Sequence, residues 1–508
     1  MHRLKSCLTV AGLAVAFVAC ARADSVLPDA NRASGVIGVK SYANLRLWNA
    51  GFEVSEEKFL TRSQVEEDLA QLERELTDKY SYLKLRAVDY RSALAAVRAG
   101  ASEKSSVSAF SVQVEKFMAL FGDGHSRLGD VQRLPGRAPF LVGQAGDRYV
   151  AFLENREHFL DDAHPVLIAM DGVPLEKWLE AARRLRGGSL QFVERNACEE
   201  LRSINFLRSE MGLPLKDSLQ VELADLRGTK KVVRNLALAK RSPRFGDWPR
   251  RKSAVLDGGI GYLRIADMEP EPQFLEDLHA RLKNFQGTHG LIIDVRGNGG
   301  GSRAVINELL PYFMAPDEAP RVVNAAFARL RTGQPANKPE GYLKNRFLYP
   351  AATWPWSDAE KMAIARFQAG LKLEWSPPPS GFSDMHVFVV PAQLPRGGHR
   401  YDRPVLVLMD SGCFSATDIF LGAFKGLRNA TLLGTASGGG SGRTSSLVLQ
   451  HSGLKISYST MVSFQPDGRL YDGNGVQPDV VVTTVATDLI GETDSQLAAA
   501  LTGLQSSR

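Results

Sequence analysis

Residues 404–420 read PVLVLMDSGCFSATDIF, an apolar run that breaks at small residues and continues as an amphipathic segment. This pattern predicts a strand, a tight turn and a helix, with Ser415 in the first helical turn. Unpaired backbone N–H groups and the helix dipole favour negative charge there, so Ser415 is a candidate nucleophile. Serine is also a preferred N-cap residue, and this segment alone leaves a purely structural role open.

The segments before Ser415 predict an α/β core that contains a glycine-rich turn. A strand is expected at 260–265, a helix at 272–285 and a second strand at 290–295, which enters DVRGNGGGS at 294–302. Glycines at such a turn let backbone N–H groups approach a ligand. The segment lacks the G-x-G-x-x-G spacing and the lysine of a phosphate loop, which favours an oxyanion hole, although a plain glycine turn stays open.

Two further segments offer partners for a serine nucleophile. His125 lies in FGDGHSRL at 121–128, and its neutral imidazole could accept the proton of Ser415. An aspartate of DGRLYDGNG at 467–475 could orient that histidine, although Asp-Gly is also a common turn sequence. No metal-binding spacing accompanies these residues, so neither a metal ion nor another cofactor is expected.

The beginning of the chain predicts export. Arg3 and Lys5 precede an apolar run at 8–19 and the small-residue site Ala21-Arg22-Ala23, which predicts a signal peptide at 1–23 and a periplasmic or secreted protein. Acylation of Cys20 is an alternative. No later segment has the apolar length of an integral membrane span.

The net charge and the cysteine content argue against a nucleic-acid-binding protein and against a domain built on disulfides. The formal net charge is +6, and the basic residues are scattered, so nucleic acid is not an expected partner. Beyond the leader only Cys198 and Cys413 remain, which is no disulfide framework, although one bridge between them stays open.

The chain of 508 residues is too long for one core, and its composition suggests several domains. Val65, Leu69, Leu72 and Leu76 recur at helical intervals, whereas short strands and turns dominate after about residue 131. The predicted division after the signal peptide is an N-terminal helical domain at 24–130, a β-rich module at 131–245, a first core segment at 246–323, an insertion at 324–402, a second core segment at 403–486, and a C-terminal helix and tail at 487–508.

Three motifs occur in the order found in one peptidase family. DVRGNGGG at 294–301 matches D-x-R-x-N-x-G-G, SATD at 415–418 matches S-A-S-E, and GVQPD at 475–479 matches G-V-x-P-D. The chain thus resembles the tail-specific, or carboxyl-terminal processing, serine peptidases. GDGHS at 122–126 is similar to their tricorn-like branch. The resemblance implies an α/β core of the ClpP/crotonase-like type, a mixed sheet with helices, preceded by the helical domain and a PDZ-like module at 131–245.

The family activates its serine in two ways, and the sequence discriminates between them. Processing proteases use a lysine in G-K-G-[ST], but gapless alignment places Gly440 at that position. Arg443 is close in sequence, but a guanidinium is not a base at ordinary pH. Lys425 lies on the predicted nucleophile helix and is a poor substitute. A Ser-Lys dyad is therefore not expected.

The tricorn-like branch implies a catalytic set of Ser415, His125 and Asp472, in which Asp472 stands where the family usually has Glu. Asp467 and Asp479 stay open as alternative acids, and Ser126 receives no role. The resemblance implies backbone N–H groups of Ala416 and of Gly299 or Gly300 as the oxyanion hole.

The resulting prediction is an exported serine endopeptidase that acts on polypeptides, bound by a C-terminus or as an extended strand on the PDZ-like module. The alternatives are a catalytically silent peptide-binding protein and an esterase-type acyl hydrolase. The absence of G-x-S-x-G around Ser415 disfavours the esterase. The oligomeric state and a gating role of the segment 324–402 stay open.

Overall fold

The computed structural model describes residues 57–129, 131–337, 341–395 and 397–506. The predicted signal peptide, Cys20 and the beginning of the predicted helical domain, residues 24–56, lie outside the described residues. Within the described portion of the chain, no helix is long and apolar enough to span a membrane.

A six-stranded mixed sheet forms the centre of the α/β core, and Ser415 follows one of its strands. Only the first pair is antiparallel, and the other neighbours are parallel. In spatial order the strands are β10 (Ala254–Leu256), β11 (Ile260–Arg264), β12 (Gly290–Asp294), β16 (Val405–Met409), β17 (Ala430–Gly434) and β21 (Val480–Val481). The predicted strand, turn and helix at 404–420 are confirmed as β16 and α10 (Ala416–Phe424).

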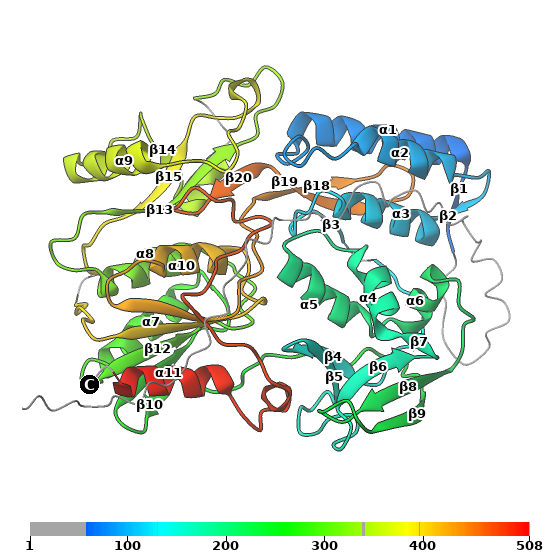
Figure 1. The fold of residues 1–508 in the computed structure, drawn as a ribbon. Coiled ribbons are helices and arrows are strands. Elements are labelled where there is room, and N and C mark those ends of the chain that lie inside the picture. Colours follow the sequence, from blue (N-terminus) through cyan, green and yellow to red (C-terminus); the bar gives the residue numbers. More distant parts are fainter. Residues whose placement is uncertain (1–56, 130, 338–340, 396, 507–508) are drawn as a thin grey trace, which may run out of the picture. The chain divides into compact units, whose positions relative to one another are not determined.

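Helices cover both faces of this sheet (Figure 1). Side chains of α7 (Pro272–Asn284), α8 (Ala304–Leu309) and α10 pack with Ile293 and Val407. Leu497 and Leu504 of α11 (Ser495–Ser506) pack with the alternate residues Ile292 and Leu408 on the other face. This alternation follows from the period of two in a β-strand, and it produces near-continuous apolar strands such as β12.

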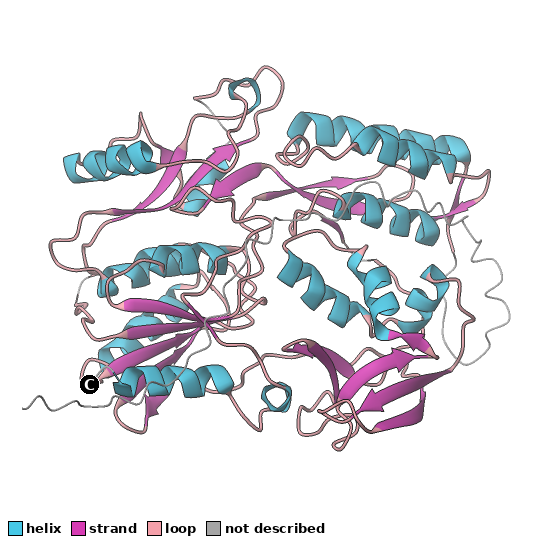
Figure 2. Ribbon diagram, viewed as in Figure 1, coloured by secondary structure: helices cyan, strands magenta, loops and turns pink. Residues whose placement is uncertain are grey.

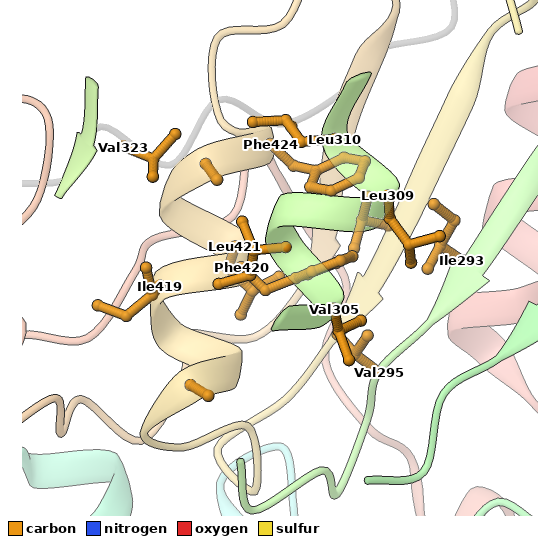
Figure 3. Packing of buried hydrophobic residues seen from close by; sticks show 14 of the residues in the cluster. Ile293, Val295, Val305, Leu309, Leu310, Val323, Ile419, Phe420, Leu421 and Phe424 are labelled. Atoms are coloured by element: carbon orange, nitrogen blue, oxygen red, sulfur yellow. The ribbon is translucent and has the colours of Figure 1, made fainter. Parts of the chain in front are cut away.

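Helix α10 is buried along its whole length. Figure 3 shows its side chains Phe420 and Leu421 on the side that faces Val305 and Leu309 of α8. All nine residues of α10 are buried. Ser415 therefore stands at the N-terminal end of a helix that is fixed by packing on every side.

The segment 324–402, predicted as an insertion, belongs to an antiparallel sheet that the core completes. The sheet contains β14 (Tyr349–Pro350), β15 (His386–Val390), β13 (Arg321–Ala328) and β20 (Met461–Phe464). Strand β13 crosses the boundary that was predicted between 323 and 324, because the strand begins before that point and its pairing with β20 lies beyond it. Helix α9 (Asp358–Gly370) follows β14 along the chain.

The N-terminal helices share a hydrophobic core with strands from the second half of the chain. They are α1 (Arg62–Lys79), α2 (Tyr90–Ala99) and α3 (Val107–Ala119), accompanied by the short pair β1 (Phe59–Leu60) and β2 (Ser105–Ser106). Leu72 and Phe117 belong to one buried cluster with Val387 and Phe464. Strand β3 (Arg127–Leu128) pairs with β19 (Lys455–Ser459), which pairs with β18 (Thr444–Val448). The helices predicted at 63–120 are thus present, but their core is not separate.

Residues 141–237 form an antiparallel sheet with helices, as Figure 2 shows. Its strands are β4 (Leu141–Ala145), β5 (Arg148–Phe152), β6 (Val166–Met170), β7 (Val173–Pro174), β8 (Ser218–Ala224) and β9 (Lys231–Ala237). Three helices interrupt the strands and were not predicted from the sequence: α4 (Leu175–Arg183), α5 (Leu190–Glu200) and α6 (Ile204–Glu210). Their apolar residues pack on the sheet, as Trp178 and Leu179 do.

Four short 3-10 helices complete the described chain. They are η3 (Leu310–Phe313), η4 (Gly341–Arg346), η5 (Pro379–Gly381) and η6 (Ala486–Ile490).

Candidate active site

Ser415 occupies the N-cap position of α10, but it does not cap the helix. Its side chain makes no capping hydrogen bond. Its backbone has φ 60° and ψ −116°, a conformation that few residues other than glycine adopt and that typically costs about 1–3 kcal/mol. The structural-cap interpretation is therefore wrong.

His125 contacts the Ser415 hydroxyl directly. Its Nε2 lies 3.2 Å from Ser415 Oγ, which is within reach of a hydrogen bond. The loop that carries His125 is held by Asp123, whose Oδ1 accepts a hydrogen bond from the His125 backbone N–H at 3.0 Å. Ser126 Oγ donates to the other oxygen of Asp123, so Ser126 contacts the loop acid instead of the nucleophile. The predicted pairing of His125 with Ser415 is thus present.

Asp472 lies behind His125, on the side away from Ser415. Its Oδ1 is 3.9 Å from His125 Nδ1, and that buried nitrogen has no hydrogen-bond partner among the residues the structure describes. The carboxylate itself is fully buried and accepts hydrogen bonds from Tyr82 Oη at 2.6 Å and from Ser441 Oγ at 3.0 Å.

The two alternative acids are placed elsewhere. Asp467 pairs with Arg469 at 2.8 Å. Asp479 pairs with Lys425 at 3.1 Å and accepts the Leu432 N–H at 2.9 Å. Of the three aspartates that the sequence offered, Asp472 is the one that lies beside His125.

A second buried carboxyl group, Asp123, was missed by the sequence analysis. Burial and the negative charge of Asp472 raise the pKa of the Asp123 carboxyl. Burial works in the same direction on Asp472, but the nearby His125 and the hydrogen bonds from Tyr82 and Ser441 outweigh it and lower the pKa of Asp472. The environments of the two carboxyl groups therefore push their pKa values apart, which favours an ionised Asp472 beside His125.

Asp123, His125 and Asp472 are also the residues that could approach one metal ion, since a ligand atom of each lies within 4.8 Å of the others. The carboxylate oxygens are, however, already engaged by hydroxyl and backbone donors, namely Tyr80, Tyr82, Ser126, Ser441 and the N–H of His125. The donor set fits a network of hydrogen-bonded carboxyl groups better than it fits a metal centre.

The glycine-rich turn lies against the nucleophile. A Cβ added to Gly300 would fall 2.7 Å from Ser415 Cβ, so only glycine allows this approach. The Gly300 N–H donates to Asn298 Oδ1 at 2.9 Å, so of the two alternatives Gly299 or Gly300 this structure favours Gly299. For Gly299 and Ala416, no hydrogen bond of the backbone N–H is recorded within the described chain. These two groups remain the candidate donors.

The polar residues of the glycine motif fix this turn. Asn298 Oδ1 also accepts a hydrogen bond from Thr417 Oγ1 at 2.7 Å, which joins the turn to α10. Arg296 pairs with Asp294 at 2.6 Å and with Asp494 at 2.7 Å, next to the start of α11. The turn is thus anchored to the helices on both faces of the sheet.

An aromatic stack occupies the space in which a lysine base would lie. Phe414 stacks on Phe192 with ring centroids 4.5 Å apart, and its ring centroid lies 4.6 Å from that of His125. A Cβ at Gly440 would overlap the Phe414 ring, so position 440 has no room for a lysine. Lys425, at the opposite end of α10 from Ser415, donates to Gln477 O and pairs with Asp479.

The loop that carries Gly440 is held by the acid of the nucleophile motif. Asp418 accepts hydrogen bonds from the N–H groups of Gly439 at 3.1 Å and Gly440 at 2.9 Å, and from the Ser437 hydroxyl. Burial raises the pKa of Asp418 to about 7.

Cys198 and Cys413 are both free and buried. Cys413 Sγ contacts Val295 O and Asp410 in the turn before Ser415, and burial raises the pKa of its thiol well above the ordinary value. These two cysteines, both in the described chain, therefore form no bridge with each other.

Comparisons with known proteins indicate a peptidase family. The family model described as Peptidase family S41 matches residues 259–482. A carboxy-terminal-processing protease of Bartonella bacilliformis is 35% identical over 82 residues, which is 16% of this chain and 18% of the relative. A probable CtpA-like serine protease of Staphylococcus epidermidis is 32% identical over 83 residues, 16% of this chain and 17% of the relative. The matched segment thus spans less than a fifth of either relative.

The crystal structure of mature CPAF is similar over most of the chain. It has a TM-score of 0.59 and 17% sequence identity, and the match covers 84% of this chain and 94% of that one. At this identity the likeness shows the fold. The family description and the names of both relatives indicate a serine protease.

Proposed function

We propose that this chain is an exported serine endopeptidase of the S41 family, in which His125 rather than a lysine activates Ser415. The observation that carries the proposal is the distance of 3.2 Å between His125 Nε2 and Ser415 Oγ. A nucleophile and a base within hydrogen-bond reach, with an acid behind the base, form the arrangement that generates an alkoxide at neutral pH.

The proposed reaction is acyl transfer to water. His125 Nε2 accepts the Ser415 proton while Oγ attacks the peptide carbonyl, and the backbone N–H groups of Gly299 and Ala416 stabilise the oxyanion. The same nitrogen then donates its proton to the leaving amine. In the second half of the cycle His125 accepts a proton from water while the water oxygen attacks the acyl carbon, and it then returns that proton to Ser415 Oγ as the ester bond breaks and the acid product leaves.

Asp472 stabilises the positive charge that His125 gains in each half of the cycle. Because the pKa of Asp472 is lowered, its carboxylate is ionised when the imidazole becomes protonated. The separation of 3.9 Å from Nδ1 means that the interaction in this structure is one of charge and not a direct hydrogen bond.

The proposed substrates are polypeptides that enter as a C-terminus or an extended strand on a PDZ-like module at 131–245. Strands β4 and β9 are the edges of its sheet, and an edge strand can pair with a peptide backbone. Helix α5 links this module to the site, since Ser189 Oγ donates to Gly438 O at 2.6 Å and Gln191 Nε2 donates to Ser437 O at 2.6 Å.

One observation favours a second candidate, a catalytically silent peptide-binding protein. The His125 Nδ1 atom is buried without a hydrogen-bond partner in the portion of the chain that the structure describes. Against this candidate, a silent protein has no need for the strained Ser415 backbone or for free N–H groups beside the hydroxyl.

The test is digestion of casein and of long peptides by the purified protein and by Ser415→Ala. Loss of an acting nucleophile typically lowers turnover on the order of 10⁶-fold. Ser411→Ala, a serine in the same turn, is the matched control and is expected to retain activity. Substantial digestion by Ser415→Ala would overturn the assignment, whereas cleavage of activated esters without digestion of any peptide would support the esterase alternative.

Mass spectrometry of the mature N-terminus tests export, with cleavage before Asp24 as the expected result.

A further inference from the structure

The segment from Tyr80 to Arg86, between α1 and α2, contacts both of the loops that carry the partners of Ser415. It precedes the histidine loop in the sequence and is separated from it by α2 and α3. The two loops are Phe121–His125 and Tyr471–Gly473, and neither belongs to a helix or a strand.

The Arg86 guanidinium joins the two loops. Its Nη1 donates to Phe121 O at 2.9 Å and also to Gly122 O. Its Nη2 donates to Asp472 O at 2.9 Å. One rigid planar group therefore holds backbone carbonyls of the histidine loop and of the acid loop in a fixed relation.

Two glycines leave the room that this guanidinium requires. A Cβ added to Gly122 would overlap Arg86 Nη1, and a Cβ added to Gly473 would overlap Arg86 Nη2. Both glycines have a positive φ, +59° and +91°. Each loop thus has a glycine at the position where it contacts the Arg86 guanidinium.

Two tyrosines of the same segment contact the carboxyl groups. Tyr82 Oη donates to Asp472 Oδ2 at 2.6 Å, and Tyr80 Oη donates to Asp123 Oδ2 at 3.4 Å. Both tyrosines are fully buried, and their rings lie edge to face with centroids 6.1 Å apart. The segment therefore fixes the Asp472 carboxylate as well as its backbone.

We infer that Arg86 is a positioning residue that sets the placement of His125 relative to Asp472. No direct hydrogen bond joins His125 Nδ1 to Asp472, so their separation must be set by the groups that hold the two loops. Arg86 is a side chain with hydrogen bonds to both of these loops. This inference rests on the proposed function, because it concerns the same catalytic set.

The experiment compares Arg86→Ala and Arg86→Lys with the unmodified protein. It measures the rate at which a fluorophosphonate labels Ser415, and kcat and KM on one peptide substrate. Displacement of a catalytic group by about 1 Å can cost about 100-fold. Arg86→Ala should therefore lower labelling and kcat by roughly 10- to 100-fold at similar KM. Arg86→Lys should be intermediate, since an ammonium group does not reproduce the planar fork.

Guanidinium rescue distinguishes positioning from general stability. Millimolar guanidinium chloride should raise the labelling rate of Arg86→Ala several-fold. It should not change the labelling of the unmodified protein or of Ser415→Ala. The matched control is Arg91→Ala, an exposed arginine on α2 that lies over the Tyr90 ring. Its labelling rate and kcat are expected to equal those of the unmodified protein.

A second variant keeps the inference testable when Arg86→Ala does not fold. Tyr82→Phe removes one hydroxyl and keeps the buried ring, and it should lower kcat roughly tenfold, the scale typical of residues that orient a functional group. Labelling and kcat at the unmodified level in Arg86→Ala overturn the positioning role alone. An unmodified protein that is neither labelled at Ser415 nor active overturns the proposed function, and the positioning role with it.

Discussion

Phe414 and Gly440 together determine which side chains fit next to Ser415. The Phe414 ring lies between Phe192 and His125, and it fills the volume into which a side chain at position 440 would extend. The histidine is therefore packed against an aromatic surface that a lysine at 440 would displace. A side chain at position 440 is therefore incompatible with the present packing of Phe414 against His125.

We predict that Gly440→Ala lowers both the stability of the protein and the reactivity of Ser415. Overpacking a close-packed region typically costs about 1–3 kcal/mol in the free energy of unfolding. The new methyl group should push Phe414 toward His125 and slow fluorophosphonate labelling of Ser415. Urea denaturation and labelling rates measure both effects. Gly370→Ala, where an added Cβ meets no atom within 4 Å, is the control: it should leave the labelling rate unchanged and should not lower the free energy of unfolding. Equal behaviour of the two variants would refute this account of position 440.

The turn from β16 to α10 is held in place by contacts with the glycine turn and with the loop that contains Gly440. Asn298 joins the glycine turn to Thr417 on α10, and Asp418 joins α10 to the loop that contains Ser437 and Gly440. Because α10 is buried on every side, these contacts place the strained Ser415 on a rigid support. A strained backbone conformation persists only where the surrounding structure holds it.

We expect Asp418 to make the stability of this element depend on pH. Burial raises its pKa from 3.8 to about 7, so the folded protein binds a proton that the unfolded chain has released. The contribution of Asp418 to the free energy of unfolding therefore falls as pH rises from about 4 to about 7, and this contribution changes little above pH 7. Asp418→Asn removes the titration. The difference in unfolding free energy, native protein minus variant, should decrease between pH 5 and pH 8. A difference that is constant with pH would contradict the raised pKa.

The whole site is assembled from distant segments of one chain. His125 follows the N-terminal helices, Ser415 follows the central strand β16, and Asp472 lies beyond β20 near the end of the core. The N-terminal helices share their hydrophobic cluster with strands of the second half, which explains why they can hold the histidine loop. Unfolding of these helices should therefore remove the base as well as local structure.

Much of this arrangement could be predicted from local sequence. The β16–α10 turn has a strong periodic signal, and His125 and Asp472 lie in short motifs that resemble known ones. Val65, Leu69, Leu72 and Leu76 were expected on one helix face and are all buried. The predictions of the turn and of the helix face are confirmed because their information is contained in neighbouring residues.

The remaining features depend on contacts that no local pattern encodes. Tyr82 reaches Asp472 across 390 positions of the sequence, and Phe192 reaches Phe414 from another module. Whether Gly299 or Gly300 offers its N–H depends on the side-chain amide of Asn298. The interval 324–402 looked like an insertion because its strand β13 pairs on one side with β20, which lies after residue 460.

The most direct test of the account is the fluorophosphonate labelling rate of Ser415 in His125→Ala and in Lys425→Ala. Lys425 is the lysine at the far end of the nucleophile helix, and its ion pair with Asp479 holds it there. The account predicts a loss of about 10⁴-fold or more in His125→Ala and an unchanged rate in Lys425→Ala. Labelling that survives in His125→Ala but disappears in Lys425→Ala would contradict a histidine-activated serine.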